Sequence, residues 1–376
     1  MSIRKGQHHI LILKFPYSST FGGGEKHTLT LVEQLRHKHQ FYLLSTCTVL
    51  LKEFQQRHWA TATTWAGTEP VTPQALVLFV FTAPWIMLNL IRWLVVYKAR
   101  YHIDTIFCLS LTEKVLLTPW ARLLGMKVIW MEHLQIERWL KANPLRLGYV
   151  LWSHLATVVT VVEAVREQLM QLGVPQAHTA VIYNAVNVKA FTPHPSRLED
   201  LITAYRVLFV GRLAKEKGID DLLEAIAQTR KLIPQIRLTL VGSGLWKPEL
   251  EHLADTLHIA DITKFVGFQN DIPQWIKQCD ILVLPSVRRE TFGLVIIEAL
   301  ATDKPVIATI TGGLTEIVDR YGWLVPPRRP AALAEALLDV YNNYELAQYK
   351  ARSGRIRVLE LFQEQRMIED YDALFS

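Results

Sequence analysis

The sequence predicts an α/β protein of two doubly wound, Rossmann-like domains that face each other across a cleft. Short apolar runs alternate with helical patterns along the chain, which is typical of parallel sheets covered by helices. The alternation pauses once, in a loop-like stretch at residues 187–195, and then resumes. Glycine-containing loops follow several of the runs, and open parallel sheets bind ligands at the carboxyl ends of their strands.

The first domain is expected to cover residues 1–186 and the second residues 187–360, and a C-terminal helix at about residues 360–376 is expected to pack back on the first domain. The strands of the first domain are predicted at residues 9–15, 41–45, 105–109, 127–131 and 157–161. Those of the second domain are predicted at residues 205–210, 237–241, 264–266, 281–284 and 305–309.

The composition indicates a globular protein of a reducing compartment. With 376 residues, half of them hydrophobic, the chain can bury two substantial cores. Cys47, Cys108 and Cys279 are far apart and form no C-x-x-C pair, which argues against a disulfide framework or a zinc site. The apolar run at residues 8–15 is too short for a signal peptide and leads into a glycine loop. A cytoplasmic location is therefore expected.

Basic residues are concentrated in the first half of the chain. Residues 1–184 hold 18 Lys and Arg against 10 Asp and Glu, whereas the remaining residues hold 23 against 25. Such an excess can serve nucleic acid, an anionic membrane surface or a phosphate-bearing substrate. No nucleic-acid-binding module accompanies it. We therefore expect a phosphate-bearing substrate and an anionic membrane as partners, with the protein peripheral at the inner membrane face and no nucleic acid bound.

An apolar segment at residues 75–97 leaves three interpretations open. It is interrupted by Pro84 and Arg92, and Lys98 and Arg100 flank it. Its charge-free part falls just short of the roughly 18 to 20 residues that a bilayer crossing needs. A core helix of the first domain and a helix on a membrane surface both fit the segment, and the interruptions weigh against a spanning helix.

Two carboxylates mark the stretch at residues 285–301. Glu290 follows the predicted strand at residues 281–284, and Glu298 lies in the helical run that begins near Gly293. A carboxylate can accept two hydroxyl protons at once and therefore suits a ribose diol or a sugar ring. Solvated carboxylates without a ligand are the simpler alternative, but the surrounding motifs favour a nucleotide-sugar site.

Glycines and cations follow other predicted strands. In the first domain, Gly23 and Gly24 open a helix whose free backbone amides favour an anion, although a plain tight turn is the alternative. In the second domain, Arg212 can clamp a phosphate in bidentate fashion while Lys217 adds a point charge. Further glycine turns lie at Gly242 and at residues 311–314.

Together these segments resemble the family 4 retaining glycosyltransferases of the GT-B fold. The matching motifs are GGGE at residues 22–25, YNAVN at 183–187, VGRLAKEKG at 210–218, VGSG at 241–244, FVGF at 265–268, ETFGLVIIEAL at 290–300 and TGGLTEIV at 311–318. They follow the family's order over nearly the whole chain and are more specific in the second domain.

The resemblance implies a role for each candidate residue. Arg212 and Lys217 would neutralise the donor diphosphate. Glu298 would hold the ribose, and Glu290 would contact the transferred sugar. Further donor contacts would come from Gly23, Gly24, Gly242, Gly312, Gly313 and Leu314.

In the first domain, His133 follows the predicted strand at residues 127–131 and resembles the histidine of the family that contacts the donor sugar. His133 and Glu290 are therefore the catalytic candidates, with a purely structural histidine as the alternative for His133. Acceptor contacts would come from Glu132, Arg138 and Lys141.

The implied reaction is retaining, metal-independent transfer of a hexose from a UDP- or GDP-sugar to a glycan or lipid-linked acceptor, as in the synthesis of cell-envelope polysaccharides. No cofactor or metal is expected, because the D-x-D motif at Asp370 and Asp372 lies in a predicted terminal helix and the two cations already supply charge. A nicotinamide-dependent oxidoreductase would share the topology, but G-x-G-x-x-G is absent after either first strand. A degenerate binding or scaffold subunit is the alternative function.

Overall fold

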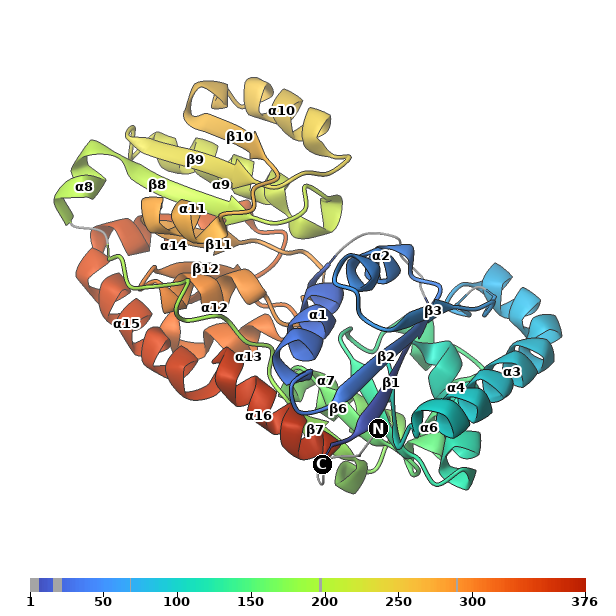
Figure 1. Ribbon diagram of the computed structural model, residues 1–376. Helices are drawn as coiled ribbons and strands as arrows, with labels where there is room; N and C mark the ends of the chain where they lie inside the picture. Colours follow the sequence, from blue (N-terminus) through green and yellow to red (C-terminus); the bar gives the residue numbers. More distant parts are fainter. Residues whose placement is uncertain (1–6, 16–21, 68, 196–197, 289) are drawn as a thin grey trace. The chain divides into compact units, whose positions relative to one another are not determined.

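The computed structural model describes residues 7–15, 22–67, 69–195, 198–288 and 290–376 (Figure 1). The chain divides into two compact units, each with its own parallel sheet and covering helices. The first unit comprises Met1–Ile182 and Ile368–Ser376, and the second comprises Tyr183–Met367. The division after Ile182 lies slightly earlier than the one expected after residue 186. The predicted fold class, two parallel sheets with alternating helices, is confirmed.

The first unit is built on a seven-stranded parallel sheet in the order β3-β2-β1-β4-β5-β6-β7. All residues of β4 are buried, which explains why its sequence does not alternate between apolar and polar residues. The sequence did not predict β3 and β7, because three residues carry too little pattern. The strands are β1 (His9–Lys14), β2 (Gln40–Ser45), β3 (Thr61–Thr63), β4 (Thr105–Cys108), β5 (Lys127–Glu132), β6 (Thr157–Thr160) and β7 (Thr179–Val181).

The helices of the first unit include one of 29 residues, α3, which contains the apolar segment at residues 75–97. It begins after Thr72, whose hydroxyl accepts a hydrogen bond from the Ala75 amide at 3.2 Å. Helix α3 packs against α4, and α4 packs against α6 (Figure 1). The helices are α1 (Gly23–Leu35), α2 (Thr48–Gln56), α3 (Pro73–Tyr101), α4 (Leu111–Leu123), α5 (Arg138–Lys141), α6 (Arg146–Ser153), α7 (Glu163–Leu172) and the 3-10 turn η1 (Gln176–His178).

The second unit is built on a six-stranded parallel sheet in the order β10-β9-β8-β11-β12-β13. Strand β8 lies between β9 and β11, so the chain moves to one side of β8 and then to the other. This reversal creates a topological switch point at the carboxyl end of β8. The strands are β8 (Tyr205–Val210), β9 (Ile236–Val241), β10 (Thr263–Gly267), β11 (Ile281–Leu284), β12 (Val306–Thr309) and β13 (Trp323–Val325).

Helices cover this second sheet, and α9 packs beside α14 while α12 packs beside α15. The α-helices of the second unit are α8 (Leu198–Thr203), α9 (Ile219–Arg230), α10 (Lys247–Thr256), α11 (Ile272–Gln278), α12 (Leu294–Ala301), α13 (Leu314–Val318), α14 (Pro330–Asn342) and α15 (Tyr344–Leu361). The 3-10 turns are η2 (Lys215–Lys217), η3 (Ala260–Ile262) and η4 (Asp319–Tyr321).

The last helix, α16 (Glu364–Phe375), contributes residues 368–375 to the first unit. Phe375 is buried there, with its ring centroid 5.8 Å from that of Phe107. Asp372 accepts a hydrogen bond from Lys38 and lies 2.8 Å from Nε2 of His39. Asp372, one carboxylate of the D-x-D motif, therefore attaches the C-terminal helix to the first unit.

Candidate functional site

The loops that follow β8, β11 and β12 are joined by backbone hydrogen bonds. The amide of Val287, after β11, donates to the carbonyl of Glu216, after β8, at 3.0 Å. The amide of Gly313, after β12, donates to the carbonyl of Glu290 at 2.9 Å. These loops therefore form one connected rim at the carboxyl end of the second sheet, where open sheets bind ligands.

Lys217 and Glu290 form an ion pair on this rim. Lys217 Nζ donates to Glu290 Oε2, and the Ser286 hydroxyl lies 3.4 Å from the same oxygen. The two side chains are 18% and 22% exposed, so the pair is shielded from bulk solvent but reachable by a ligand. The structure thus brings together two residues that the sequence proposed for neighbouring parts of one donor.

Arg212 lies on the loop after β8 with most of its side chain in solvent. Its Nη2 donates to Glu216 Oε1 at 2.9 Å, and the side chain of Arg212 is 65% exposed. Exposed pairs of this kind contribute only about 0.2 to 1 kcal/mol. The guanidinium can therefore exchange Glu216 for an anionic ligand at little cost.

Two glycines allow the loops of this rim to approach each other closely. Gly218 has φ +65°, and a Cβ atom there would lie 2.1 Å from the carbonyl oxygen of Pro285. Gly242 has φ +141°, and its Cβ would lie 1.8 Å from the carbonyl oxygen of Gly211. No side chain larger than hydrogen fits at either position without moving the backbone.

The remaining donor candidates follow β11 and β12 in the chain. Glu298 is partly exposed on α12, which begins after Gly293 in the left-handed conformation. The amides of Gly313 and Leu314 already donate to the carbonyls of Glu290 and Thr311, at 2.9 and 3.1 Å. A diphosphate that bound these two amides would first have to replace both hydrogen bonds.

In the first unit, the glycine loop and His133 come together at the carboxyl ends of β1 and β5. Gly22 caps α1, and its amide donates to Glu25 Oε2 at 2.9 Å, while Lys14 donates to the other carboxylate oxygen. A Cβ atom on Gly24 would lie 3.4 Å from Cδ2 of His133. Gly23 is exposed beside them. The start of α1 therefore lies directly against the imidazole ring.

His133 packs edge-on against a second histidine. The ring centroids of His27 and His133 are 4.9 Å apart with planes at 73°, and the ring of Tyr371 lies 5.3 Å from that of His27. Burial lowers the pKa of His27 to about 4. Burial, aided by His27, also lowers the pKa of His133 well below its ordinary range. Both rings are therefore neutral at pH 7.

Among the described residues, neither ring nitrogen of His27 has a hydrogen-bond partner, and Nε2 of His133 lacks one as well. The ring of His133 is partly exposed although its Nε2 is buried. A polar atom in this situation is an exception to the rule that buried polar groups are paired, and it suits a ligand that supplies the missing partner.

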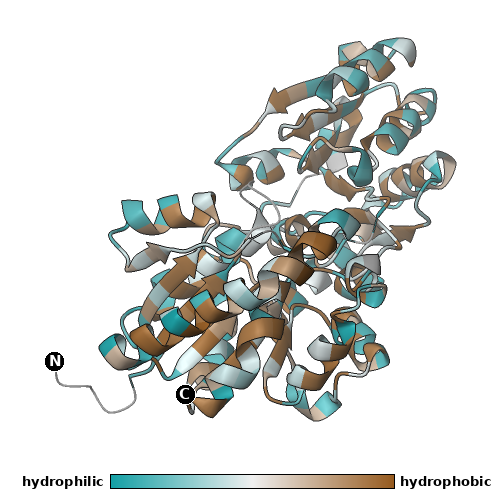
Figure 2. Ribbon diagram, turned by 90° about the vertical axis from the view of Figure 1, so that its right-hand side faces the viewer, coloured by the Kyte–Doolittle hydropathy of each residue, from teal (hydrophilic) through white to brown (hydrophobic). Residues whose placement is uncertain are grey.

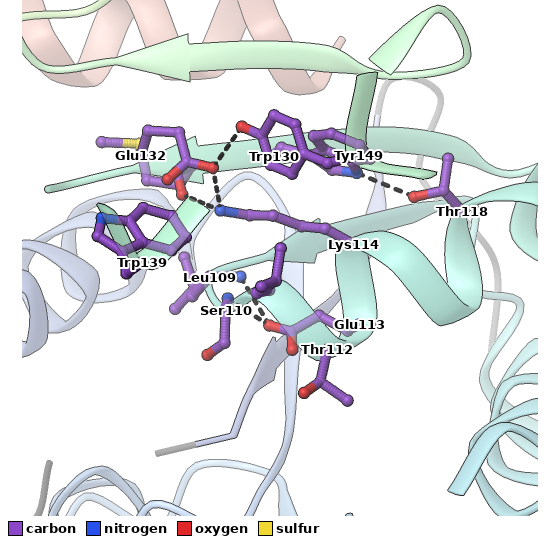
Figure 3. A network of polar contacts seen from close by, with 12 residues as sticks. Leu109, Ser110, Thr112, Glu113, Lys114, Thr118, Trp130, Glu132, Trp139 and Tyr149 are labelled. Carbon is purple, nitrogen blue, oxygen red and sulfur yellow. Dashed lines mark hydrogen bonds and ion pairs between the residues drawn. The ribbon is translucent and has the colours of Figure 1, made fainter. Parts of the chain in front are cut away.

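Glu132, predicted on the acceptor side, belongs instead to a buried network (Figure 3). Its Oε1 accepts from Lys114 Nζ at 2.5 Å and from the Tyr149 hydroxyl at 2.7 Å. Lys114 also donates to the carbonyl of Met131 at 2.7 Å. Because Glu132 is only 4% exposed, its carboxylate anchors the end of β5 and does not face an acceptor, so the expectation for this residue is corrected.

The other two acceptor candidates lie on α5. Lys141 is exposed, whereas the side chain of Arg138 lies outside the described part of the structure.

A pair of buried carboxyl groups lies close to the same network. Glu69 accepts from the hydroxyl of Thr112 at 2.8 Å. Glu113 accepts from the amides of Ser110 and Leu109 at 2.6 and 3.0 Å (Figure 3). Burial raises the pKa of Glu69 to about 7. Burial and the neighbouring Glu69 raise the pKa of Glu113 to about 8.

Sequence reasoning missed these partners to different degrees. Ser110 and Glu113 have the spacing of a capping box, so that part could have been found from sequence. The contacts of His27 with His133 and of Glu69 with α4 join segments far apart in the chain, and no local pattern announces them.

Two features of the described ranges bear on metal binding and on membrane contact. No group of three or more His, Cys, Asp or Glu side chains that could hold a metal ion occurs there. One helix in those ranges, α3, is long and apolar enough to cross a membrane by length and composition alone.

Two family models match the chain. The model described as Glycosyltransferase Family 4 matches residues 21–190, and the model described as Glycosyl transferases group 1 matches residues 201–357. The chain belongs to the family 4 glycosyltransferases of the GT-B fold. The resemblance inferred from its motifs is thereby confirmed.

Curated relatives of this glycosyltransferase match over part of their length. The D-inositol 3-phosphate glycosyltransferase of Streptomyces avermitilis is 39% identical over 196 residues, which cover 47% of this chain and 41% of the relative. The glycogen synthase of Mycobacterium tuberculosis is 31% identical over 221 residues, which cover 57% of this chain and 50% of the relative. The glycosyltransferase thus matches about half the length of these relatives or less.

Among solved structures, Anabaena Alr3699/HepE in complex with UDP matches this glycosyltransferase with a TM-score of 0.80 at 20% identity. The match covers 98% of this chain and 99% of the Anabaena protein. At this level of identity, the similarity shows the fold.

Proposed function

We propose that this glycosyltransferase moves a hexose from a UDP-sugar to a glycan or lipid-linked acceptor at the cytosolic face of a membrane. Transfer would retain the anomeric configuration and need no metal ion. The observation that carries the proposal is the Lys217–Glu290 pair on the rim of the second sheet. UDP is favoured over GDP because Anabaena HepE, which shares the fold, has been solved with UDP, with UDP and glucose, and with UDP-glucose.

Two cations would carry the charge of the donor diphosphate. Arg212 would exchange its exposed contact with Glu216 for two phosphate oxygens, and Lys217 would add a point charge. Each charge-assisted hydrogen bond would contribute about 1.5 to 3 kcal/mol. When the bond between the anomeric carbon and the phosphate oxygen breaks, its electron pair passes to that oxygen. Both cations would then stabilise the developing negative charge.

The two glutamates would bind the two sugars of the donor, the transferred hexose and the ribose of the nucleotide. A carboxylate has about four lone-pair sites, so Glu290 can keep Lys217 and accept hydroxyl protons of the hexose at the same time. Glu298 would accept protons from the ribose hydroxyls. Because Lys217 contacts Glu290, the cation that binds the diphosphate also positions the carboxylate that binds the sugar.

In the first unit, His133 would contact the transferred sugar through its unpaired nitrogen, and the amides of Gly23 and Gly24 would add a second contact. A neutral imidazole offers one donor and one acceptor. The low pKa of His133 matters for the reaction, because an oxocarbenium-like transition state would be repelled by a charged imidazolium.

Retention requires the acceptor oxygen to attack the anomeric carbon from the face that the diphosphate leaves. The new carbon–oxygen bond then has the configuration of the old one. The acceptor proton would pass to the departing phosphate oxygen, which balances the reaction without a protein base. We therefore assign no side chain as general base.

The acceptor class is proposed separately from the donor. The relatives are named for an inositol phosphate and for glycogen, so family membership does not select one acceptor. Lys141, exposed on α5, is the described candidate for an acceptor contact. A scaffold subunit without turnover is the second candidate function, because the same side chains could bind a nucleotide-sugar without transferring it.

Turnover in the presence of a chelator tests this proposal. Purified protein with EDTA should release UDP from UDP-glucose slowly without acceptor and faster with a suitable glycan, and the first sugar anomer seen by NMR should be the α form. Glu290→Gln should slow release by about 10²-fold or more. Binding of UDP without release would favour the scaffold function, and release of the β anomer would contradict retention.

A further inference from the structure

Helix α3 packs against the rest of the first unit along one side. Its buried side chains are Phe79, Ile86, Leu90, Leu94 and Tyr97, and they recur at intervals of three, four and seven residues. This spacing places them on one stripe of the helix. The stripe extends over most of the helix, so α3 is packed on the protein through much of its length.

Polar contacts fix the middle of α3 as well. The side-chain amide of Asn89 donates to the hydroxyl of Thr64 at 2.8 Å and to the carbonyl of Trp65 at 2.7 Å. A helix that crosses a bilayer alone needs lipid on all sides over about 30 Å. The buried stripe and the Asn89 contacts are incompatible with that arrangement.

The side of α3 opposite the stripe is also apolar, and the rest of the described chain leaves it exposed. Phe81 is 74% exposed, Trp85 is 70% exposed, and Val77 and Leu88 are 62% and 58% exposed. At about 100° per residue, these four positions fall on one arc that points away from the buried stripe. Figure 2 views the molecule from the side that carries α3. A soluble surface rarely leaves so many large apolar side chains together.

The charges around this face select its partner. The 29 residues of α3 contain no Asp or Glu, whereas Arg92, Lys98 and Arg100 are cationic. Trp65, 55% exposed, is held against α3 by Asn89, so two exposed tryptophans, Trp65 and Trp85, accompany the cations. Cations attract anionic headgroups, and tryptophan rings favour the headgroup region of a bilayer.

The neighbouring helix, α4, also carries exposed apolar side chains beside a cation. On α4, which packs against α3, Leu123 is 77% exposed and Trp120 is 38% exposed, with Arg122 between them in sequence. An apolar surface with cations and no acidic residue on its main helix fits a lipid surface.

We propose that the exposed face of α3, comprising Val77, Phe81, Trp85 and Leu88, lies in the headgroup and acyl boundary of an anionic bilayer, with the helix axis along the membrane plane. The inference deepens the proposed function by naming the lipid contact and its helix. It does not depend on the donor site, so the two can fail separately.

Flotation with lipid vesicles tests the contact. The purified full chain should float with vesicles of phosphatidylcholine and phosphatidylglycerol at low salt, and less with phosphatidylcholine alone. The double substitution Phe81→Glu with Trp85→Glu should weaken vesicle binding by at least about tenfold, because two apolar anchors are lost and charge is added. Wild-type protein that ignores both vesicles, or a double variant that floats like wild type, would overturn the proposal.

A matched control places the same charges on exposed apolar residues of the second unit. Leu232 and Ile356 are 70% and 59% exposed, so Leu232→Glu with Ile356→Glu should leave flotation unchanged. Thermal stabilisation by UDP should be the same in all three proteins, which shows that they are folded and separates this test from that of the donor site. A wild-type dimer that the α3 substitutions dissociate, with flotation unaffected, would make the face a self-contact and overturn the proposal.

Cysteine labelling distinguishes a helix along the membrane from one that crosses it. Cys47, Cys108 and Cys279 are buried, so added cysteines should dominate the signal. Ala75→Cys and Arg100→Cys place a thiol near each end of α3, away from the arc that faces the bilayer. On vesicle-bound protein, a membrane-impermeant maleimide should label both variants from outside. Protection of one end would indicate a spanning helix and contradict the proposed placement.

Discussion

Lys217 and Glu290 are 73 residues apart in sequence, yet the Lys217 ammonium donates to a carboxylate oxygen of Glu290. The contact joins the loop after β8 to the loop after β11, on either side of the switch point of the second sheet. Both side chains are mostly shielded, so removal of either one would break this ion pair. The pair couples the proposed diphosphate contact to the proposed sugar contact.

The loops on this rim lie so close together that an added methyl group at Gly218 should destabilise them. Gly218→Ala would place a Cβ 2.1 Å from a backbone oxygen, whereas Gly125→Ala would meet nothing within 4 Å. Both glycines have positive φ, +65° and +72°, so the backbone strain of about 1 kcal/mol is shared. Gly218→Ala should be clearly less stable than Gly125→Ala in urea denaturation and should lose UDP binding. Equal effects would show that the close approach is not enforced.

The buried carboxyl groups predict that stability falls as pH rises toward 8. The pKa of Glu69 is raised to about 7 and that of Glu113 to about 8, above the ordinary value of 4.5. The folded state therefore holds protons that the unfolded state releases above pH 4.5, and each group destabilises the fold progressively until its folded pKa is passed. Thermal unfolding should show Glu113→Gln gaining stability relative to wild type between about pH 6 and pH 8.

The control for this measurement is Glu335→Gln, which alters an exposed carboxylate on α14. It should track wild type at both pH values. A Glu113→Gln variant that is destabilised equally at both pH values would indicate that the carboxyl group acts only through its hydrogen bonds to Ser110 and Leu109.

The His27–His133 pair predicts that the stability of the fold also falls as the pH drops into the acid range. The folded pKa of His27 is about 4, below its ordinary 6.5, so the unfolded state binds a proton that the folded state resists between these values. Stability should fall as pH drops through this window, by roughly 3 kcal/mol for His27 in full. Because His27 has no hydrogen-bond partner among the described residues, His27→Phe should reduce this acid loss in thermal unfolding. Exposed His37→Gln serves as the control, and an unchanged acid profile in His27→Phe would refute the assignment.

Lys114 and Glu132 form a buried ion pair, so the effects of substituting them on stability should depend on each other. Its atoms are 2.5 Å apart and the side chains are 2% and 5% exposed. Lys114→Met or Glu132→Gln alone should each cost about 3 to 5 kcal/mol, because the remaining group is left buried without its partner. The double variant should cost much less than the sum of the two. Additive costs in a urea-denaturation cycle would mean that the pair is not coupled.

The local sequence pattern was sufficient to predict most of the strands. It did not show which side chains contact one another in the folded protein. Each predicted strand is present, because runs such as residues 281–284 are apolar throughout and bounded by polar loops. The short strands β3, β7 and β13 have three residues each and escaped detection. The segment at residues 75–97 was recognised as apolar, but only tertiary packing decides which side of α3 is buried.

The candidate site was likewise only partly predictable from the sequence. Motifs located Arg212, Lys217, Glu290 and His133, because each follows a strand at the end where ligands bind. They could not show that Lys217 contacts Glu290, or that Glu132 is neutralised by Lys114. Such pairings depend on how loops of different strands approach one another, and a single sequence carries no direct record of them.

Calorimetric titration of UDP in the presence of EDTA tests the donor site most directly. Wild-type protein should bind UDP, and Lys217→Ala and Arg212→Ala should each weaken binding by at least about tenfold through loss of a charge-assisted contact. Lys215→Ala, which removes an exposed cation from the same turn, should bind like wild type. Loss of binding in all three variants alike, or no binding by wild type without metal, would contradict the proposed site.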